Sequence, residues 1–287
     1  GVIEATNRAN LQIRGIGGEH AALIDSLMAA GLGPTSAAGD DVRNLMLSPG
    51  AGIDRQMLID TRPLAEQILA TLQSDERFHD LSAKFAVQLD GGEGLAMLEH
   101  SHDLWLSAAE RDGERVFVFG LAGCLVDLPA GAVSLEQGHA LVVAVLELFL
   151  ELARPEQTRM RHLLAECSLE GFLARLAERV PLMPIEAWRR EANPDALHIG
   201  AHPQRDAGRV YIGAVPPLGR LNPAMLRGAA QLAREQGDGT LRFTPWQSLL
   251  VPGVHGSKAP HVIHSLEHLG LRCSADDALA HLIACTG

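Results

Sequence analysis

Two stretches near the ends of the chain carry the same residue pattern, and this internal repeat constrains the fold more than any other feature. They cover residues 3–16 and 241–254. The matched positions, 238 residues apart, are Thr6 with Thr244, Leu11 with Leu249, and Gly15 with Gly253. In each copy a helix-like segment follows and ends at a glycine, Gly31 or Gly270. Unless the match is chance similarity in a chain rich in alanine and leucine, it predicts two pseudo-symmetric halves.

The two copies extend differently along the chain. A strand pattern over 210–215 and a helix pattern over 222–236 precede the second copy, whereas the first copy begins at Gly1. Conversely, a long region follows the first copy, and the second stops at Gly287. We therefore expect a chain trimmed at both ends from a longer protein. The alternative is a natural protein with unequal halves.

Between the copies, helix and strand patterns occur in mixed order, which favours an α+β fold over a doubly wound sheet. The expected helices cover 19–30, 61–73 and 134–153, and the expected strands cover 84–90, 103–110 and 115–121. The turn Arg111-Asp112-Gly113 is a strong hairpin signal, and the proline-rich segment 181–203 is the best linker candidate. The expected domains are the end of a first half (1–36), a larger lobe (37–190), a second half (191–256) and the start of a second lobe (257–287).

The composition excludes several classes of protein. Hydrophobic residues make up 47% of the chain and charged residues 21%, which is typical of a folded globular protein. A net charge of -11 argues against general nucleic-acid binding. The longest apolar run, residues 140–150, is too short to cross a bilayer. We therefore expect a cytoplasmic protein that binds neither nucleic acid nor a membrane.

The first copy of the repeat alternates between polar and apolar residues, as a strand with two different faces does. Its polar positions are Thr6, Arg8, Asn10, Gln12 and Arg14. Two arginines with amides between them are suited to a flat ligand that carries several carboxylates. The alternative is an ordinary solvated face.

These residues resemble the strand that grips the tetrapyrrole in the sirohaem-dependent nitrite and sulfite reductases. Two further blocks, 41–54 and 81–85, are similar to family segments and come in the family's order. The resemblance implies two ferredoxin-like units, each followed by a larger lobe. It also implies that Thr6, Arg8, Asn10, Gln12, Arg14, Arg43 and Asn44 bind the carboxylates of the macrocycle. Lys84 and Arg43 would be the catalytic cations, with Lys84 over the ring.

The departures from the family pattern guide the choice of function. Ala86 stands where the reductases have a second lysine that helps to hold the oxyanion, and segment 241–254 looks most like the precorrin-3B synthase branch. We therefore expect an oxygenase of aerobic cobalamin biosynthesis that hydroxylates and lactonises precorrin-3A with O2 and NADH. The alternatives are a sirohaem-dependent nitrite or sulfite reductase and a non-catalytic tetrapyrrole-binding protein.

The resemblance also implies metal cofactors. Cys285 stands where the first of four cysteine ligands of a [4Fe–4S] cluster begins in the family, and a mononuclear non-haem iron is a further expectation. The ligand partners of Cys285 would lie beyond Gly287, so we expect this chain to be inactive alone. Two histidine-rich clusters have residue types that could hold a metal, but side chains in such patterns are more often solvated or capping. They are His261, His264 and His268, and Glu99, His100, His102 and Asp103.

Overall fold

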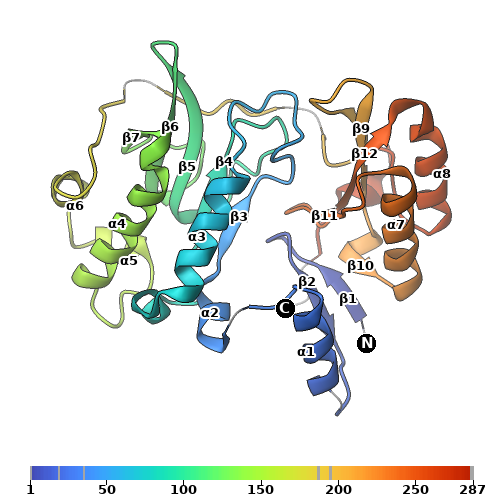
Figure 1. The fold of residues 1–287 in the computed structure, drawn as a ribbon, viewed down its shortest axis with the longest axis horizontal. Coiled ribbons are helices and arrows are strands. Elements are labelled where there is room, and N and C mark those ends of the chain that lie inside the picture. Colours follow the sequence, from blue (N-terminus) through green and yellow to red (C-terminus); the bar gives the residue numbers. More distant parts are fainter. Residues whose placement is uncertain (1, 19, 35, 186–187, 194–195, 285–287) are drawn as a thin grey trace. The chain divides into compact units, whose positions relative to one another are not determined.

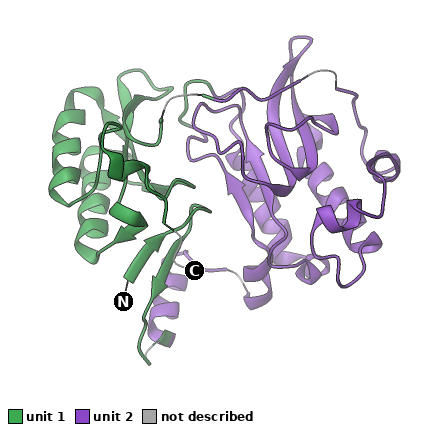
Figure 2. Cartoon of the chain, turned by 180° about the vertical axis from the view of Figure 1, so that it is seen from behind, with its two compact units in different colours: residues 1–20, 53–56, 193–287 green, residues 21–52, 57–192 purple. Residues whose placement is uncertain are grey.

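The computed structural model describes residues 2–18, 20–34, 36–185, 188–193 and 196–284. The chain forms two compact units (Figures 1 and 2). Unit 1 contains residues 1–20, 53–56 and 193–287, and unit 2 contains residues 21–52 and 57–192. The boundaries expected from the sequence stay predictions.

Unit 2 is built on a five-stranded mixed sheet with the order β3-β4-β5-β6-β7. Its strands are β3 (Leu45–Leu47), β4 (Val87–Asp90), β5 (His102–Arg111), β6 (Glu114–Gly123) and β7 (Gly131–Ser134). The first three strands are parallel and the last three antiparallel. The predicted hairpin is present: Asp112 and Gly113 connect β5 to β6 with φ angles of 53° and 82°. Both angles are positive, as a type I′ turn requires.

One face of this sheet is covered by helices. These helices are α2 (Ala37–Val42), α3 (Arg62–Ser74), α4 (Gly138–Leu152), α5 (Met160–Leu164) and α6 (Leu169–Ala177). Most of α1 (His20–Ala29) is also assigned to unit 2, but it has no buried residue. Short 3-10 helices occur at Glu76–Asp80 and Leu135–Gln137. Alternate strand residues such as Leu104, Leu106 and Phe117 join the helices in the main core. The predicted helices over 61–73 and 134–153 correspond to α3 and to the 3-10 turn plus α4, because their apolar faces meet this core.

The other face of the sheet is covered by the proline-rich segment. Trp105 and Val118 point to this face, where Met183, Ile185 and Trp188 pack against them. The segment expected to be a linker is therefore, over these residues, part of the packed body of unit 2.

Arg190 anchors the same segment through a buried ion pair. Its Nε lies 2.7 Å from Asp90 Oδ2 at the end of β4, and its guanidinium also donates to the carbonyl of Glu93. Burial and the neighbouring Asp90 raise the pKa of Glu93 to about 9. The pairing compensates the cost of burying the Asp90 charge, which is 1% exposed at its side chain.

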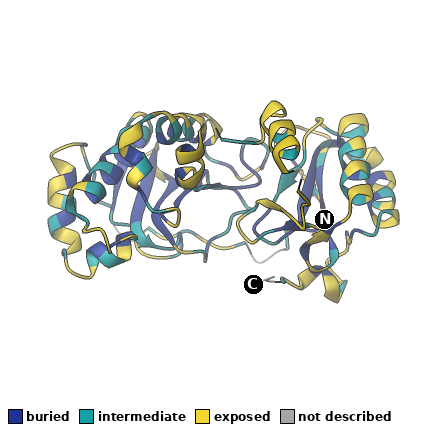
Figure 3. Cartoon of the chain, turned by 90° about the horizontal axis from the view of Figure 1, so that it is seen from below, coloured by how far each residue is buried: buried dark blue, intermediate teal, exposed yellow. Residues whose placement is uncertain are grey.

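Unit 1 contains two antiparallel sheets. A three-stranded sheet has the order β10-β1-β2, and a four-stranded sheet has the order β11-β12-β9-β8. The strands are β1 (Val2–Ala5), β2 (Leu11–Arg14), β8 (Gly200–Pro203), β9 (Arg209–Ala214), β10 (Arg220–Leu221), β11 (Arg242–Phe243) and β12 (Leu249–His255). The helices are α7 (Pro223–Gln236) and α8 (Ala259–His268), with 3-10 turns at Pro217–Gly219, Gly256–Lys258 and Ala278–His281. Both helices bury apolar side chains against the four-stranded sheet. Figure 3 shows this burial along the ribbon.

The predicted internal repeat is visible in the backbone. The turn after β1 and the turn after β11 have the same hydrogen bonds: Thr6 N donates to Asn10 O at 2.9 Å, and Thr244 N donates to Ser248 O at 3.0 Å. Ala9 and Gln247, which also match at an offset of 238, both have a φ of 58°. Gly15 and Gly253 have φ angles of 68° and 75°. The two copies therefore share a backbone conformation as well as a residue pattern.

Within the described part of the chain, none of the helices is long and apolar enough to cross a membrane.

Candidate functional site

The nine residues predicted to form one polar strand instead form a turn and a shorter strand. β1 ends at Ala5 and β2 begins at Leu11. Thr6 Oγ1 accepts hydrogen bonds from the backbone N–H groups of Arg8 (3.3 Å) and Asn10 (3.1 Å). A threonine that bonds its own backbone in this way competes with the ladder of a sheet. The prediction of a single strand over 6–14 is wrong for this reason.

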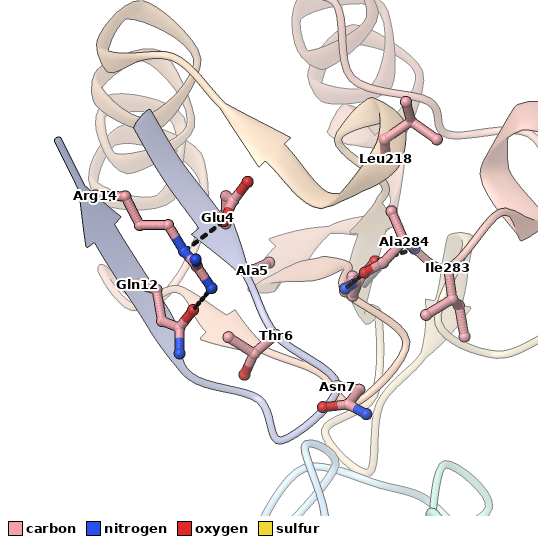
Figure 4. A pocket seen from close by; sticks show the side chains of 10 residues that line it. Glu4, Ala5, Thr6, Asn7, Gln12, Arg14, Leu218, Ile283 and Ala284 are labelled. Carbon is pink, nitrogen blue, oxygen red and sulfur yellow. Dashed lines mark hydrogen bonds and ion pairs between the residues drawn. The ribbon is translucent and has the colours of Figure 1, made fainter. Parts of the chain in front are cut away.

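A pocket in unit 1 collects part of the predicted polar set (Figure 4). It is lined by Glu4, Ala5, Thr6, Asn7, Gln12, Arg14, Leu218, Gln247, Ile283 and Ala284, and has a volume of about 230 Å³. Thr6, Gln12 and Arg14 of the predicted set line it, whereas Arg8 and Asn10 do not. Ligand pockets usually enclose roughly 300–1,000 Å³. The pocket is therefore suited to one edge of a large ligand.

The polar wall of the pocket comes from the three-stranded sheet. Glu4 lies on the central strand opposite Gln12 on one side and Arg220 on the other. Arg14 Nε is 3.0 Å from Glu4 Oε2, and Arg14 Nη2 donates to Gln12 Oε1 at 2.9 Å. Arg220 Nε is 3.5 Å from Glu4 Oε1. A buried carboxylate thus stands between two arginines that reach solvent.

The opposite wall comes from the second copy of the repeat and the segment after α8. Gln247 Nε2 donates to Ala284 O at 2.6 Å, and Ala284 N donates to Gln247 Oε1 at 3.0 Å. One side chain therefore holds the backbone of Ala284 through two hydrogen bonds, as a neighbouring strand would. Cys285 itself lies outside the described residues, and its role as a cluster ligand stays a prediction.

Unit 2 brings the other predicted site residues together. Because β3 and β4 are parallel and in register from Leu45 and Val87, the residues before them share one edge of the sheet. The side-chain amide of Asn44 donates to Ala83 O at 2.7 Å, next to Lys84. Arg43 Nε pairs with Asp40 Oδ1 at 2.7 Å, and Lys84 is exposed. Arg43, Asn44 and Lys84 thus form a second polar group, at one edge of unit 2.

Ala86, where the family pattern has a second lysine, is buried, and its backbone is bound to a buried aspartate. Ala86 N donates to Asp103 Oδ2 at 2.9 Å. Asp103 is 1% exposed and also pairs with Arg159, whose Nε lies 2.8 Å from the same oxygen. The cation nearest to Ala86 in this network is therefore already paired.

The described residues do not provide a metal centre. A [4Fe–4S] cluster needs four ligands, normally thiolates, and the structure describes three cysteines, Cys124, Cys167 and Cys273, all of them free. Burial raises the pKa of Cys273 to about 12, which keeps its thiol protonated. Among the described residues, no three histidine, cysteine or acidic side chains gather as a metal site requires. The expected non-haem iron site is not supported either, because Asp103 is bound to Arg159 and to backbone N–H groups.

Two pocket residues escaped the sequence interpretation. Glu4 is a charged residue in a short strand pattern. Its position between two arginines becomes visible only through its register with Arg220, which is far away in sequence. Gln247 could have been found from the repeat, because it stands opposite Ala9 at a position where both copies have a positive φ.

Comparisons with known proteins identify the family. The model of the "Nitrite and sulphite reductase 4Fe-4S domain" matches residues 38–182, which is half of the chain. The "Nitrite/Sulfite reductase ferredoxin-like half domain" matches residues 202–269. The chain belongs to the nitrite and sulfite reductase family. The expected α+β fold of that family, with ferredoxin-like halves, is confirmed.

The similar proteins within this family are mostly longer. The chain is 30% identical to the chloroplastic ferredoxin–nitrite reductase of Zea mays, with all of the chain and 54% of that protein aligned. It is 31% identical to the enzyme of Oryza sativa subsp. japonica (100% and 52% aligned) and 29% identical to that of Synechococcus elongatus (99% and 59%). The chain thus spans about half the length of these relatives. The structure of the NirA protein of Mycobacterium tuberculosis superposes with a TM-score of 0.83 at 21% identity, over 100% of this chain and 54% of that one.

The names of these relatives correct one prediction. They are ferredoxin–nitrite reductases, so the prediction of a precorrin-3B synthase-like oxygenase is wrong. The predictions of precorrin and O2 as substrates and of NADH as electron donor, which depended on it, are not supported either. The alternative, a nitrite or sulfite reductase, is the one that the comparisons favour. Neither alanine at position 86 nor the residue pattern of segment 241–254 is enough to place the chain in the precorrin-3B synthase branch.

Proposed function

We propose that this chain is the part of a ferredoxin-dependent nitrite reductase that holds a carboxylate-rich tetrapyrrole, sirohaem, and faces the anion to be reduced. The proposal is carried by the pocket of unit 1, where Arg14 and Gln12 lie beside one another on the strand that resembles the family's tetrapyrrole-binding segment. The ferredoxin–nitrite reductases that align with the whole chain support the same reaction.

The donors of the pocket fit one carboxylate-bearing edge of such a macrocycle. Arg14 has five N–H groups, and among the described residues only Gln12 accepts a hydrogen bond from its guanidinium. The remaining donors can form the two-pronged contact that arginine makes with carboxylates, and each charged hydrogen bond contributes about 1.5–3 kcal/mol. Thr6 and Gln12 add neutral polar contacts on the same wall.

Lys84 and Arg43 would hold the anion. Sirohaem, when bound, supplies the iron at which electrons reach that anion. The side chains of Lys84 and Arg43 would supply positive charge where negative charge develops in the reaction. In enzymes, removing a single group of this kind raises the activation free energy by several kcal/mol. Thr6, Arg8, Asn10, Gln12, Arg14, Arg43 and Asn44 stay proposed tetrapyrrole contacts, with Thr6, Gln12 and Arg14 the best supported, and Cys285 stays the proposed first cluster ligand.

Ala86 favours nitrite over sulfite as the anion. Nitrite carries one negative charge, whereas sulfite is a dianion near and above neutral pH and needs more positive charge around it. With alanine at position 86 and Arg159 paired to Asp103, this chain provides one cation fewer than the family pattern. The loss costs a dianion about twice as much Coulomb energy as a monoanion.

The test uses the full-length protein, purified without oxygen and loaded with sirohaem. We expect strong visible absorption from the bound macrocycle and reduction of nitrite by reduced ferredoxin, with kcat/KM for sulfite at least about tenfold lower. Lys84→Ala should lower kcat/KM for nitrite by about 10²-fold. Lys258→Ala, at the other lysine of the chain, is the matched control because Lys258 is also exposed.

A protein that retains sirohaem but reduces sulfite faster than nitrite would overturn the choice of anion. A protein that does not retain sirohaem would overturn the proposal as a whole.

A further inference from the structure

The carboxylate of Glu4 is an unusual component of a pocket for an anionic ligand. Its side chain is 8% exposed, while that of its partner Arg14 is 46% exposed. Glu4 Oε2 accepts no hydrogen bond from any described residue, although Arg14 Nε lies 3.0 Å away. The attraction between them is therefore one of charge, without a directed N–H···O bond.

This geometry leaves the donors of Arg14 available while lowering the charge around them. Glu4, Arg14 and Arg220 together carry a net charge of about +1, because the single carboxylate lies between the two guanidinium groups. A ligand carboxylate that binds Arg14 is attracted by both arginines and repelled by Glu4. Charges a few ångström apart at a partly exposed site interact by roughly 1 kcal/mol or more.

The repulsion affects small and large ligands differently. A free oxyanion such as phosphate depends on the local charge alone, so a repulsion of this size removes most of its affinity. Phosphate also carries nearly two negative charges above neutral pH, so the repulsion costs it about twice as much binding energy as it costs a single carboxylate on a macrocycle, which also keeps the other contacts of the ring.

We propose that Glu4 is a specificity-determining residue that sets the charge of this pocket, so that it holds a carboxylate on a macrocycle and discriminates against free oxyanions. The proposal rests on the tetrapyrrole-binding role given above, which it refines. Glu4 does not react; it acts through Arg14 and Arg220.

The test measures binding of uroporphyrin, a metal-free tetrapyrrole with eight carboxylates, to the full-length apoprotein by fluorescence. Each titration is repeated with phosphate replacing chloride at constant ionic strength. Glu4→Gln keeps the shape and removes the charge, so we expect uroporphyrin to bind about three- to tenfold tighter in chloride. Measured above neutral pH, phosphate should then compete at a concentration lower by about ten- to a hundredfold, because it carries nearly two charges.

Further variants separate charge from position. Glu4→Asp keeps the charge and should behave like the unaltered protein. Arg220→Gln, at a side chain 61% exposed, lowers the local charge and should weaken uroporphyrin binding about threefold. Glu267→Gln removes one negative charge at an exposed position on α8, so it is the control and should change neither measurement.

The outcomes distinguish this inference from the proposed function. If Arg14→Ala weakens uroporphyrin binding but Glu4→Gln binds no tighter, or phosphate gains no more than uroporphyrin does, the role of Glu4 is wrong and the pocket stands. Should Glu4→Gln fail to fold, an unchanged affinity in Arg220→Gln overturns the role of Glu4 by itself. If the unaltered protein does not bind uroporphyrin and Arg14→Ala changes nothing, both proposals fail.

Discussion

The β1–β2 hairpin and the β11–β12 hairpin have the same turn but very different surroundings. β12 lies between β11 and β9, and Leu249 and Val251 are fully buried. β2 is the edge strand of its sheet, and the matching residues Leu11 and Ile13 are 38% and 37% exposed.

The difference separates what the local sequence determines from what packing adds. The threonine that closes each turn needs only its own backbone, so the turn is preserved whether or not the hairpin is covered. Burial of the strand depends on β9 and α7, which the second hairpin has as neighbours. We expect most of the difference in stability between the hairpins to come from this covering layer.

The largest expected effect is on the matched leucines. Leu249→Ala should lower the free energy of unfolding by about 3 kcal/mol, because it leaves a cavity in a closed core. Leu11→Ala should cost less than about 1 kcal/mol, because the side chain is already partly in water. Denaturant midpoints of the two variants measure the contrast, and equal losses would show that the first hairpin is covered to the same degree in solution.

A second contrast lies in the response of the two turns to pH. Trp246 in the second turn stacks on His198 with ring centroids 5.0 Å apart, whereas the matching residue in the first turn is the exposed Arg8. Burial lowers the pKa of His198 from 6.5 to about 4. The unfolded chain therefore takes up a proton at this site between these values and the folded chain does not, so its stabilising contribution is complete above pH 6.5 and is lost as the pH falls towards 4.

His198→Phe keeps a ring against Trp246 and removes the proton uptake. Between pH 6.5 and 4.5 the variant should lose about 2 kcal/mol less stability than the unaltered protein. His261→Phe, at an exposed histidine on α8, is the matched control for the loss of an imidazole. The measurement is the free energy of unfolding at a series of pH values. If it falls equally with pH in the His198 variant and the unaltered protein, the His198 ring is solvated in the folded state.

The smallest expected effects come from glycine substitutions at the matched positions of the two turns. These substitutions should change the free energy of unfolding in opposite directions. Ala9 and Gln247 both have a φ of 58°, a conformation that costs a residue other than glycine about 1 kcal/mol. Ala9→Gly should therefore stabilise the protein by about 0.5 kcal/mol. Gln247→Gly relieves the same strain but removes two hydrogen bonds to Ala284, and should destabilise it by about 1 kcal/mol. Thermal unfolding of both variants gives the two signs, and equal signs would mean that the bonds to Ala284 contribute nothing.

The parts of the molecule that could be predicted from its sequence are those with local causes. Asp112-Gly113 determines its hairpin, Pro63 lies in the first turn of α3, and the glycines of the repeat adopt matching conformations. The site was harder, because alternating polar residues fit a two-faced strand and also a turn that binds its own threonine. The pairing of Glu4 with Arg220 could not be predicted, because it follows from the register of two short strands more than 200 residues apart.

The anchoring of Arg190 has a consequence for the order in which the chain folds. Arg190 and its partner Asp90 are 100 residues apart in sequence. Closing a loop of this length carries a large entropic cost unless the intervening residues are already compact. The sheet from β4 to β7 and helix α4 must therefore be largely in place before Arg190 reaches its site. We expect its contacts to be absent from the folding transition state, so that Arg190→Met speeds unfolding and leaves the folding rate nearly unchanged. The segment that leads into unit 1 is then among the last parts of unit 2 to become ordered.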